Sequence, residues 1–105
     1  MNLANAFSLN MLPVNSYKID IKEIKVIDAA VLLSKNINSY VGHADTAIIL
    51  SRIFNVDIQT NRTSFTFSET NNKLLVAQYS GPRLPEGTTE LPEGSGFRYF
   101  LITYL

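Results

Sequence analysis

The chain has 105 residues, in which nine basic side chains balance nine acidic ones, with a single histidine and no cysteine. This length predicts one domain, residues 1–105, whose small core would enclose a sizeable ligand only with a second copy. The composition excludes disulfides, thiolate metal sites and a histidine-rich zinc site. Zero net charge excludes a broad electrostatic field that would hold a long polyanion. We therefore expect a small ligand and no cofactor.

The amino-terminal part predicts two strands and no targeting segment. No basic segment followed by a long apolar one opens the chain, and no run approaches the roughly 20 apolar residues that span a bilayer, so we expect a cytosolic protein. The apolar segment Leu3–Phe7 gives way to a mixed segment that Pro13 ends, which predicts a strand and then a functional turn. Tyr17, Ile19 and Ile21 alternate with polar residues, which predicts a strand near an edge of the sheet.

Two helices are expected in the middle of the chain. The first runs from about Val26 to Lys35, with an acid in its first turn and a base in its last, as the helix dipole favours. The second runs from about His43 to Phe54, and Asn55 ends it. The first apolar stripe contains Ile27, Ala30 and Val31, broadened by Leu32 and Leu33, and the second contains Ile49, Leu50, Ile53 and Phe54.

The carboxyl-terminal part predicts three strands. Phe65 and Phe67 alternate with polar residues, and a second alternation covers Leu74–Tyr79, so we expect a hairpin between them. The last strand, Phe97–Tyr104, is apolar on both faces, as in a central strand covered by helices. The predicted fold is therefore α+β, a single domain with a mixed five-stranded sheet, packed helices and a long lid loop.

The lid is the loop from Ser80 to Gly96, whose glycine, proline and charged residues cannot form a core element. Loops of this length in compact domains are usually functional or disordered. Within it, Leu84–Gly87 and Leu91–Gly94 repeat the letters LPEG, which predicts two similar turns. Glu86 and Glu93 are either solvated loop carboxylates or functional groups.

His43 lies at the predicted start of a helix, where unpaired backbone N–H groups and partial positive charge favour an anion. Imidazole is the side chain best suited to carry a proton near neutral pH, so this position suits a phosphate ester, although a single histidine is more often structural than catalytic. Asp45 either pairs with His43 or complements the helix dipole.

Four segments together resemble the viral ring nucleases, small type III anti-CRISPR proteins of archaeal viruses and bacteriophages. The resemblance covers nearly the whole chain and keeps the order and approximate spacing of the motifs. The segments are Asn5–Leu12, Gly42–Thr46, Gln59–Arg62 and Gln78–Gly87.

The resemblance implies a homodimer that binds the second messenger cyclic tetra-adenylate across its two-fold axis. It would cleave the ring without a metal to linear di-adenylate with 2′,3′-cyclic phosphate ends and so inhibit type III CRISPR defence. No membrane or duplex nucleic acid is expected as a partner. By position, His43 and Glu86 match the catalytic histidine and glutamate, and Arg83 and Ser8 match residues that hold the phosphate and ribose. Ligand-contacting or site-shaping positions are matched by Asn5, Asn10, Arg62 and Gln78.

The chain departs from the family in the lid, where Pro82 and Pro85 flank Arg83 and stiffen the loop. This puts the rate of lid closure in question, and also whether Glu93 substitutes for Glu86.

These residue types suit metal-free RNA cleavage on chemical grounds as well. The Arg83 guanidinium is a planar fork for phosphate oxygens, and Ser8 and Asn10 suit the ribose. Protonated His43 would give its proton to the leaving oxygen, while Glu86, arriving with the lid, would serve either His43 or the attacking 2′-hydroxyl.

Two questions stay open at the level of sequence. Tyr79 and Phe7 either stack on adenines or belong to the core. The alternative functions are a non-catalytic cyclic-nucleotide sponge and a viral DNA-binding regulator, the second disfavoured by the neutral charge.

Overall fold

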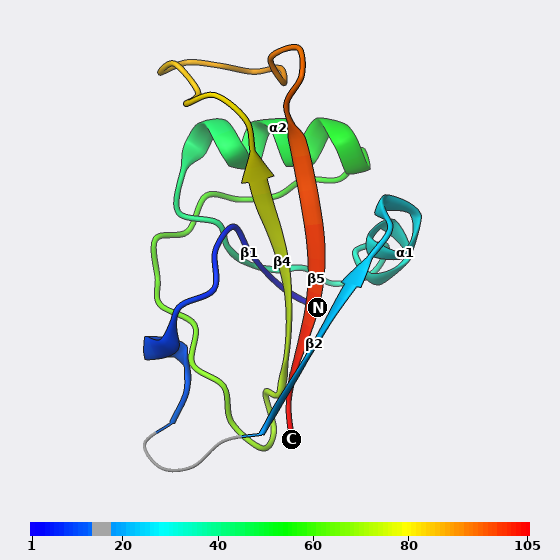
Figure 1. Cartoon of the computed structure of the whole chain (residues 1–105), viewed down its shortest axis with the longest axis vertical. Coiled ribbons are helices and arrows are strands. Elements are labelled where there is room, and N and C mark those ends of the chain that lie inside the picture. Colours follow the sequence, from blue (N-terminus) through cyan, green and yellow to red (C-terminus); the bar gives the residue numbers. More distant parts are fainter. Residues whose placement is uncertain (14–17) are drawn as a thin grey trace.

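The computed structural model describes residues 1–13 and 18–105 and contains one five-stranded mixed sheet with two α-helices (Figure 1). Tyr17, part of the predicted edge strand, lies outside the described residues. The elements are β1 (Asn2–Ala4), β2 (Ile19–Ile24), α1 (Val26–Leu32), β3 (Asn38–Tyr40), α2 (Ala44–Phe54), β4 (Lys73–Ser80) and β5 (Gly96–Tyr104), with a short 3-10 helix at Leu9–Met11.

The strand order is β2-β5-β4-β1-β3. β1 is parallel to both of its neighbours. Its Leu3 is paired with Leu75 of β4 on one side and with Ser39 of β3 on the other. β5 is antiparallel to β4 and β2, and β2 forms the edge of the sheet, as its alternating polarity predicted. The sheet is therefore parallel over β3, β1 and β4 and antiparallel over the rest.

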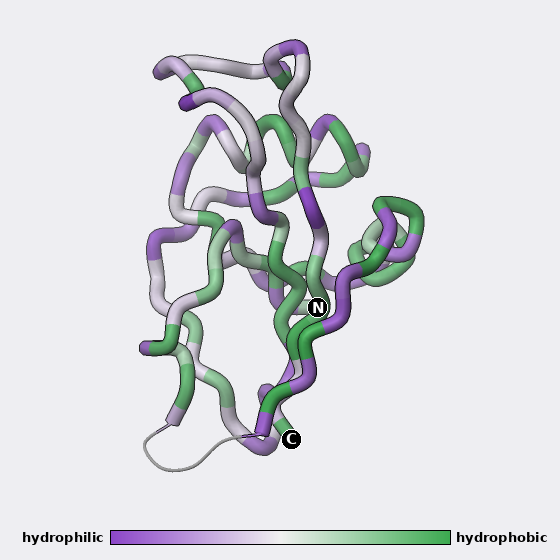
Figure 2. The backbone as a smooth tube through the Cα atoms, viewed as in Figure 1, coloured by the Kyte–Doolittle hydropathy of each residue, from purple (hydrophilic) through white to green (hydrophobic). Residues whose placement is uncertain are grey.

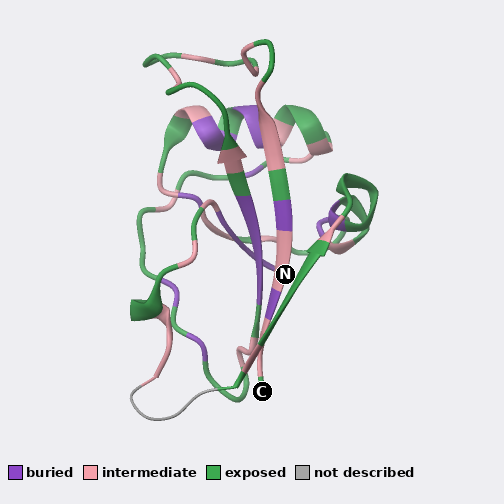
Figure 3. Ribbon diagram, viewed as in Figure 1, coloured by how far each residue is buried: buried purple, intermediate pink, exposed green. Residues whose placement is uncertain are grey.

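Both helices pack on one face of the sheet. Ala29 and Leu33 from α1 and its end, and Ala47 and Leu50 from α2, form one buried cluster with strand residues such as Leu75. Figure 3 shows buried residues along β1 and β4 and within α2. This cluster gives α2 a fixed position across the end of the sheet.

The other face is covered by loops instead of helices. Phe65 and Phe67 are buried there and meet edge to face, with 4.8 Å between ring centroids. The expectation of a strand and hairpin at these residues is wrong. The alternation correctly identified which side chains are buried, but both edges of β4 are already paired, with β1 and β5, so this segment cannot form a hairpin with β4.

Two further expectations need correction. β3 was not predicted, because only three residues form it and asparagine and serine are poor strand formers. In α1 part of the predicted stripe points outward: Ile27 and Val31 are 67% exposed, whereas Leu33 faces the core as expected, together with Ala29, which the stripe did not include. Figure 2 shows α1 as largely hydrophobic, so its apolar residues alone did not define one face.

The last strand and α2 are close to their predicted form. β5 is an interior strand, although β4 holds the middle of the sheet and helices cover only one face. In α2, Ile49 and Leu50 are buried as predicted, Phe54 is half-buried, and Ile53 is 37% exposed. Asn55 ends the helix in the left-handed conformation, with φ of 51°.

No helix in the described ranges is long and apolar enough to cross a membrane.

Candidate functional site

The candidate site lies where the carboxyl ends of the three parallel strands meet. Asn5 follows β1, His43 follows β3 by three residues, and the lid (residues 81–95) follows β4. In open sheets this edge is the usual place for ligands, because loops and helix starts converge there. Topology therefore collects three sequence-distant segments at one point.

His43 is the N-cap residue of α2 and is exposed. Its main-chain carbonyl accepts the first helical hydrogen bond from Ala47 N at 3.0 Å, while its side chain makes no capping bond. The main chain before it is held by Asn5, whose Oδ1 accepts a hydrogen bond from Gly42 N at 3.4 Å. The imidazole is thus attached to a fixed backbone and is free to act on a ligand.

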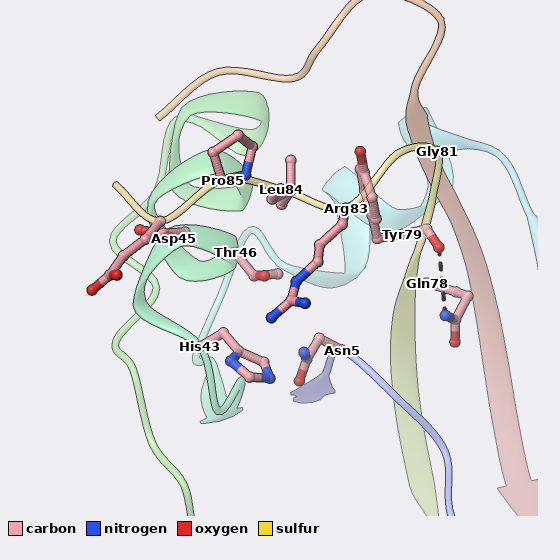
Figure 4. Close-up of a pocket in the computed structure, with 11 residues that line it drawn as sticks. Asn5, His43, Asp45, Thr46, Gln78, Tyr79, Gly81, Arg83, Leu84 and Pro85 are labelled. Carbon is pink, nitrogen blue, oxygen red and sulfur yellow. Dashed lines mark hydrogen bonds between the residues drawn. The ribbon is translucent and has the colours of Figure 1, made fainter. Parts of the chain in front are cut away.

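An open hollow of about 970 Å³ lies above His43. Five predicted site residues line it: Asn5, His43, Gln78, Arg83 and Glu86. In Figure 4 the side chains of His43, Asn5 and Arg83 point toward one another across this space, and Gln78 lies to one side, bonded to the Tyr79 carbonyl at 3.5 Å. The structure thus brings together most of the side chains that the resemblance selected.

Arg62 borders a second hollow that shares Asn5 and His43 with the first. Asn61 N donates to the Val41 carbonyl at 2.8 Å and so holds this segment beside the loop that precedes His43. A Cβ on Gly42 would lie 3.8 Å from Arg62 Cγ, which shows how closely the arginine approaches that loop.

Ser8 and Asn10 lie farther along, in a third hollow that shares Asn5 with the other two. The Ser8 hydroxyl caps the 3-10 helix by accepting a hydrogen bond from Asn10 N at 3.2 Å. These two residues therefore do not line the hollow of His43, although the three hollows adjoin one another.

The site carries two cationic side chains that form no ion pair in the described residues, although Asp45 and Glu86 line the same hollow as Arg83. Within residues 1–13 and 18–105, ion pairs join Arg52 to Glu90 and Arg98 to Glu23, while Arg83 and Arg62 form none. Both are exposed beside the start of α2, where main-chain N–H groups add partial positive charge. This arrangement is suited to an anion in a chain with no net charge.

Asp45 contacts the lid. Its Oδ2 accepts a hydrogen bond from Gly87 N at 3.1 Å. At the other end of α2, Arg52 Nη1 lies 3.4 Å from the Thr89 carbonyl oxygen and 3.6 Å from Glu90 Oε1. Neither of the roles expected for Asp45 included this contact, which no local sequence pattern indicates.

The repeated LPEG letters form two similar turns, as predicted. Thr88 N donates to the Pro85 carbonyl at 3.2 Å, and Ser95 N donates to the Pro92 carbonyl at 3.1 Å. The third residue of each turn has positive φ, 83° at Gly87 and 78° at Gly94, as in a type II turn. Glu86 lines the main hollow, whereas Glu93 does not.

Tyr79 and Phe7 make intramolecular aromatic contacts. The Tyr79 ring packs edge to face on Phe97 with centroids 5.7 Å apart, and its hydroxyl donates to the Pro82 carbonyl at 2.6 Å. Phe7 packs against Phe67 at 6.4 Å. The core interpretation therefore suits Phe7, while Tyr79 both packs on β5 and lines the main hollow.

Thr46 also lines the hollow and was not predicted. It lies in the first turn of α2 and is only 7% exposed. Its spacing of three from His43, one helical turn, is the signal that would have placed both on one side of the helix.

Comparisons with known proteins agree on one family. The STIV B116-like family model matches residues 1–96. "Uncharacterized protein 26" of Sulfolobus islandicus filamentous virus (isolate Iceland/Hveragerdi) is 34% identical over 110 residues, covering 97% of this chain and 92% of that protein. The structure of B116 of Sulfolobus turreted icosahedral virus is similar with a TM-score of 0.80 at 23% identity over 97% of each chain. The chain belongs to the STIV B116-like family of viral proteins, and its α+β fold is that of B116.

Proposed function

We propose that this STIV B116-like protein is a ring nuclease that cleaves cyclic tetra-adenylate without a metal and so counteracts type III CRISPR defence in the host cytoplasm. The observation that carries the proposal is the convergence of His43, Arg83, Glu86, Asn5 and Gln78 on one hollow at the start of α2. These residues lie far apart in the sequence and were selected together by their resemblance to one family.

The chemistry of the proposal is a transesterification. A ribose 2′-oxygen attacks the adjacent phosphorus, the bond from phosphorus to the 5′-oxygen breaks, and the products carry a 2′,3′-cyclic phosphate and a 5′-hydroxyl. His43 donates the proton that the departing 5′-oxygen needs, a role that typically contributes about 10²- to 10⁴-fold. Its exposed ring, free of capping bonds, is suited to this role.

Charge stabilisation falls to Arg83 and to the start of α2. A guanidinium can hold two oxygens of the reacting phosphate. That of Arg83 is available because it forms no ion pair with a protein carboxylate in the described residues. Arg62, in the adjoining hollow, suits a neighbouring phosphate of the same ring. Ser8 and Asn10 line the adjoining third hollow, which does not include His43, and so suit an adjacent nucleotide of the ring.

Glu86 is the carboxylate of the main hollow. It serves either as the base for the 2′-hydroxyl or as the partner of the protonated imidazole. Glu86→Gln distinguishes these roles, because loss of the base removes the acidic limb of the pH–rate profile, whereas loss of a partner shifts the limb that belongs to His43.

Two copies suit this substrate. A two-fold homodimer presents each site twice, and a ring of four identical nucleotides can place equivalent linkages at both. The single-chain hollow is open, which fits a ring that a second subunit would cover. Cleavage at two opposite linkages would yield linear di-adenylate.

The test uses purified protein with radiolabelled cyclic tetra-adenylate in EDTA. We expect multiple turnovers to linear di-adenylate with cyclic phosphate ends. Stoichiometric retention of the intact ring would replace the proposal with a sponge, and salt-sensitive binding to duplex DNA without ring cleavage would replace it with a DNA-binding regulator. Cyclic hexa-adenylate under the same conditions reports the selectivity for ring size.

A further inference from the structure

The turn that carries Glu86 has a defined main-chain geometry. Pro85 and Thr88 close it through the hydrogen bond from Thr88 N to the Pro85 carbonyl, and Gly87 supplies the positive φ. The Gly87 N–H belongs to the same planar peptide unit as the Glu86 carbonyl. Any group that holds this N–H therefore fixes the main chain of Glu86.

The group that holds it is the Asp45 carboxylate, at 3.1 Å. Asp45 is two residues from His43, in the first turn of α2, and α2 is anchored by Ala47 and Leu50 in the core. The hydrogen bond thus ties the main chain of Glu86 to the helix end that carries His43. Its effect is to set how far the carboxylate of the lid lies from the imidazole.

The second LPEG turn is an internal comparison. It has the same closing hydrogen bond and the same positive φ at its glycine, Gly94. Within the described ranges no carboxylate of α2 bonds to its main chain, and Glu93 does not line the main hollow. The turn by itself therefore does not bring a glutamate to the site, whereas the turn bound to Asp45 does.

We propose that Asp45 is a positioning residue, which seats Glu86 at the site by accepting the Gly87 N–H. The inference rests on the proposed function only for its effect on turnover. The hydrogen bond and its effect on the lid belong to the protein without any ligand.

The Asp45→Asn variant distinguishes the positioning role from two other possible roles of Asp45. The amide keeps an oxygen that can accept the Gly87 N–H but has no charge. A role in the helix dipole, or a charge acting on His43, would be lost in Asp45→Asn as fully as in Asp45→Ala. A positioning role is lost in Asp45→Ala and largely restored in Asp45→Asn.

The first measurement is independent of catalysis. In ¹⁵N NMR of the full chain, we expect Asp45→Ala to move the Gly87 amide resonance and lower its heteronuclear NOE, while Asp45→Asn preserves the NOE. The Gly94 amide in the other turn is the internal control. If the Gly87 amide keeps its shift and its NOE in Asp45→Ala, the positioning role is wrong.

The second measurement is the cleavage of cyclic tetra-adenylate at saturating and at limiting concentrations. We expect Asp45→Ala to lower kcat about 10-fold with little change in KM, and to have no further effect in a Glu86→Gln background, because positioning acts through Glu86. Glu93→Gln is the matched control and keeps the normal rate. Additive losses in the double variant would overturn the proposal. A loosened Gly87 in a protein that cleaves no ring would refute the proposed function and leave the hydrogen bond established.

Discussion

The side chain of Asn5 holds the main chain immediately before His43, with 3.4 Å between Asn5 Oδ1 and Gly42 N. Asn5 comes directly after β1, whose residues pair with β3 on one side and β4 on the other. The amide oxygen of Asn5 thus connects the main chain beside the imidazole to an interior strand of the sheet.

Asn5→Ala removes this oxygen and frees the loop that ends at His43. We expect cleavage of cyclic tetra-adenylate to fall about 10- to 100-fold, because a misplacement of about 1 Å can cost 10²-fold. Single-turnover rates measure the effect. Unchanged rates would mean that the loop holds His43 without Asn5.

His43→Ala should leave binding of the ring nearly intact and lower its cleavage about 10²- to 10⁴-fold, because general-acid catalysis is lost and the cations remain. Equilibrium binding and single-turnover cleavage are measured on the same preparation. Since the His43 imidazole is exposed and makes no capping hydrogen bond, the variant should unfold at the normal denaturant concentration. A His43→Ala protein that cleaves at the normal rate would contradict the assignment of the acid.

Arg83→Ala should weaken both ring binding and cleavage, because the guanidinium faces the hollow and has no carboxylate partner there. Arg83→Lys keeps the charge without the planar fork, so we expect it to restore binding more than turnover. Arg98→Ala is the control, since Arg98 is paired with Glu23 on β2 at 2.7 Å and does not line the hollow. Equal losses in both alanine variants would indicate a general effect of charge.

Gly81→Ala tests the base of the lid. Gly81 has φ of 147°, and a Cβ there would lie 2.5 Å from Ser95 Cβ at the far end of the lid. We expect the free energy of unfolding to fall by about 1–3 kcal/mol, since both strain and overpacking arise. Gly96→Ala is the matched control: a Cβ there meets nothing within 4 Å, and we expect no such loss. Denaturant unfolding measures the free energy of unfolding of both variants. Equal stability would show that the main chain at the base of the lid relaxes to accommodate the added Cβ.

Local chemistry made some features predictable from the sequence and left others hidden. The ends of α2 followed from His43 and Asn55, and the lid from its glycines and prolines, because caps and turns depend on near neighbours. The alternation around Phe65 and Phe67 correctly predicted that both side chains are buried. Whether a segment joins a sheet as a strand depends on which strand edges are already paired.

The resemblance selected the candidate site residues, but no single segment of the sequence indicates that they lie close together. Asn5 and Gln78 line one hollow because β1 and β4 are parallel neighbours, a pairing that the sequence pattern did not predict. The contact between Asp45 and Gly87 joins residues 42 positions apart through a loop, so no periodicity indicates it. The outward face of α1, with Ile27 and Val31, was misjudged because nearly all of its residues are apolar and the pattern has no single direction.

The place of β1 inside the sheet has a consequence for how the chain acquires its structure. Leu3 precedes its partner Leu75 by 72 positions, so the partner emerges from the ribosome much later. Pairings of such long separation carry a large loop-closure entropy and slow the folding of small domains. The residues of β1 therefore pair with β4 late, and the end of the sheet at which His43 lies is complete only after β4 has been synthesised.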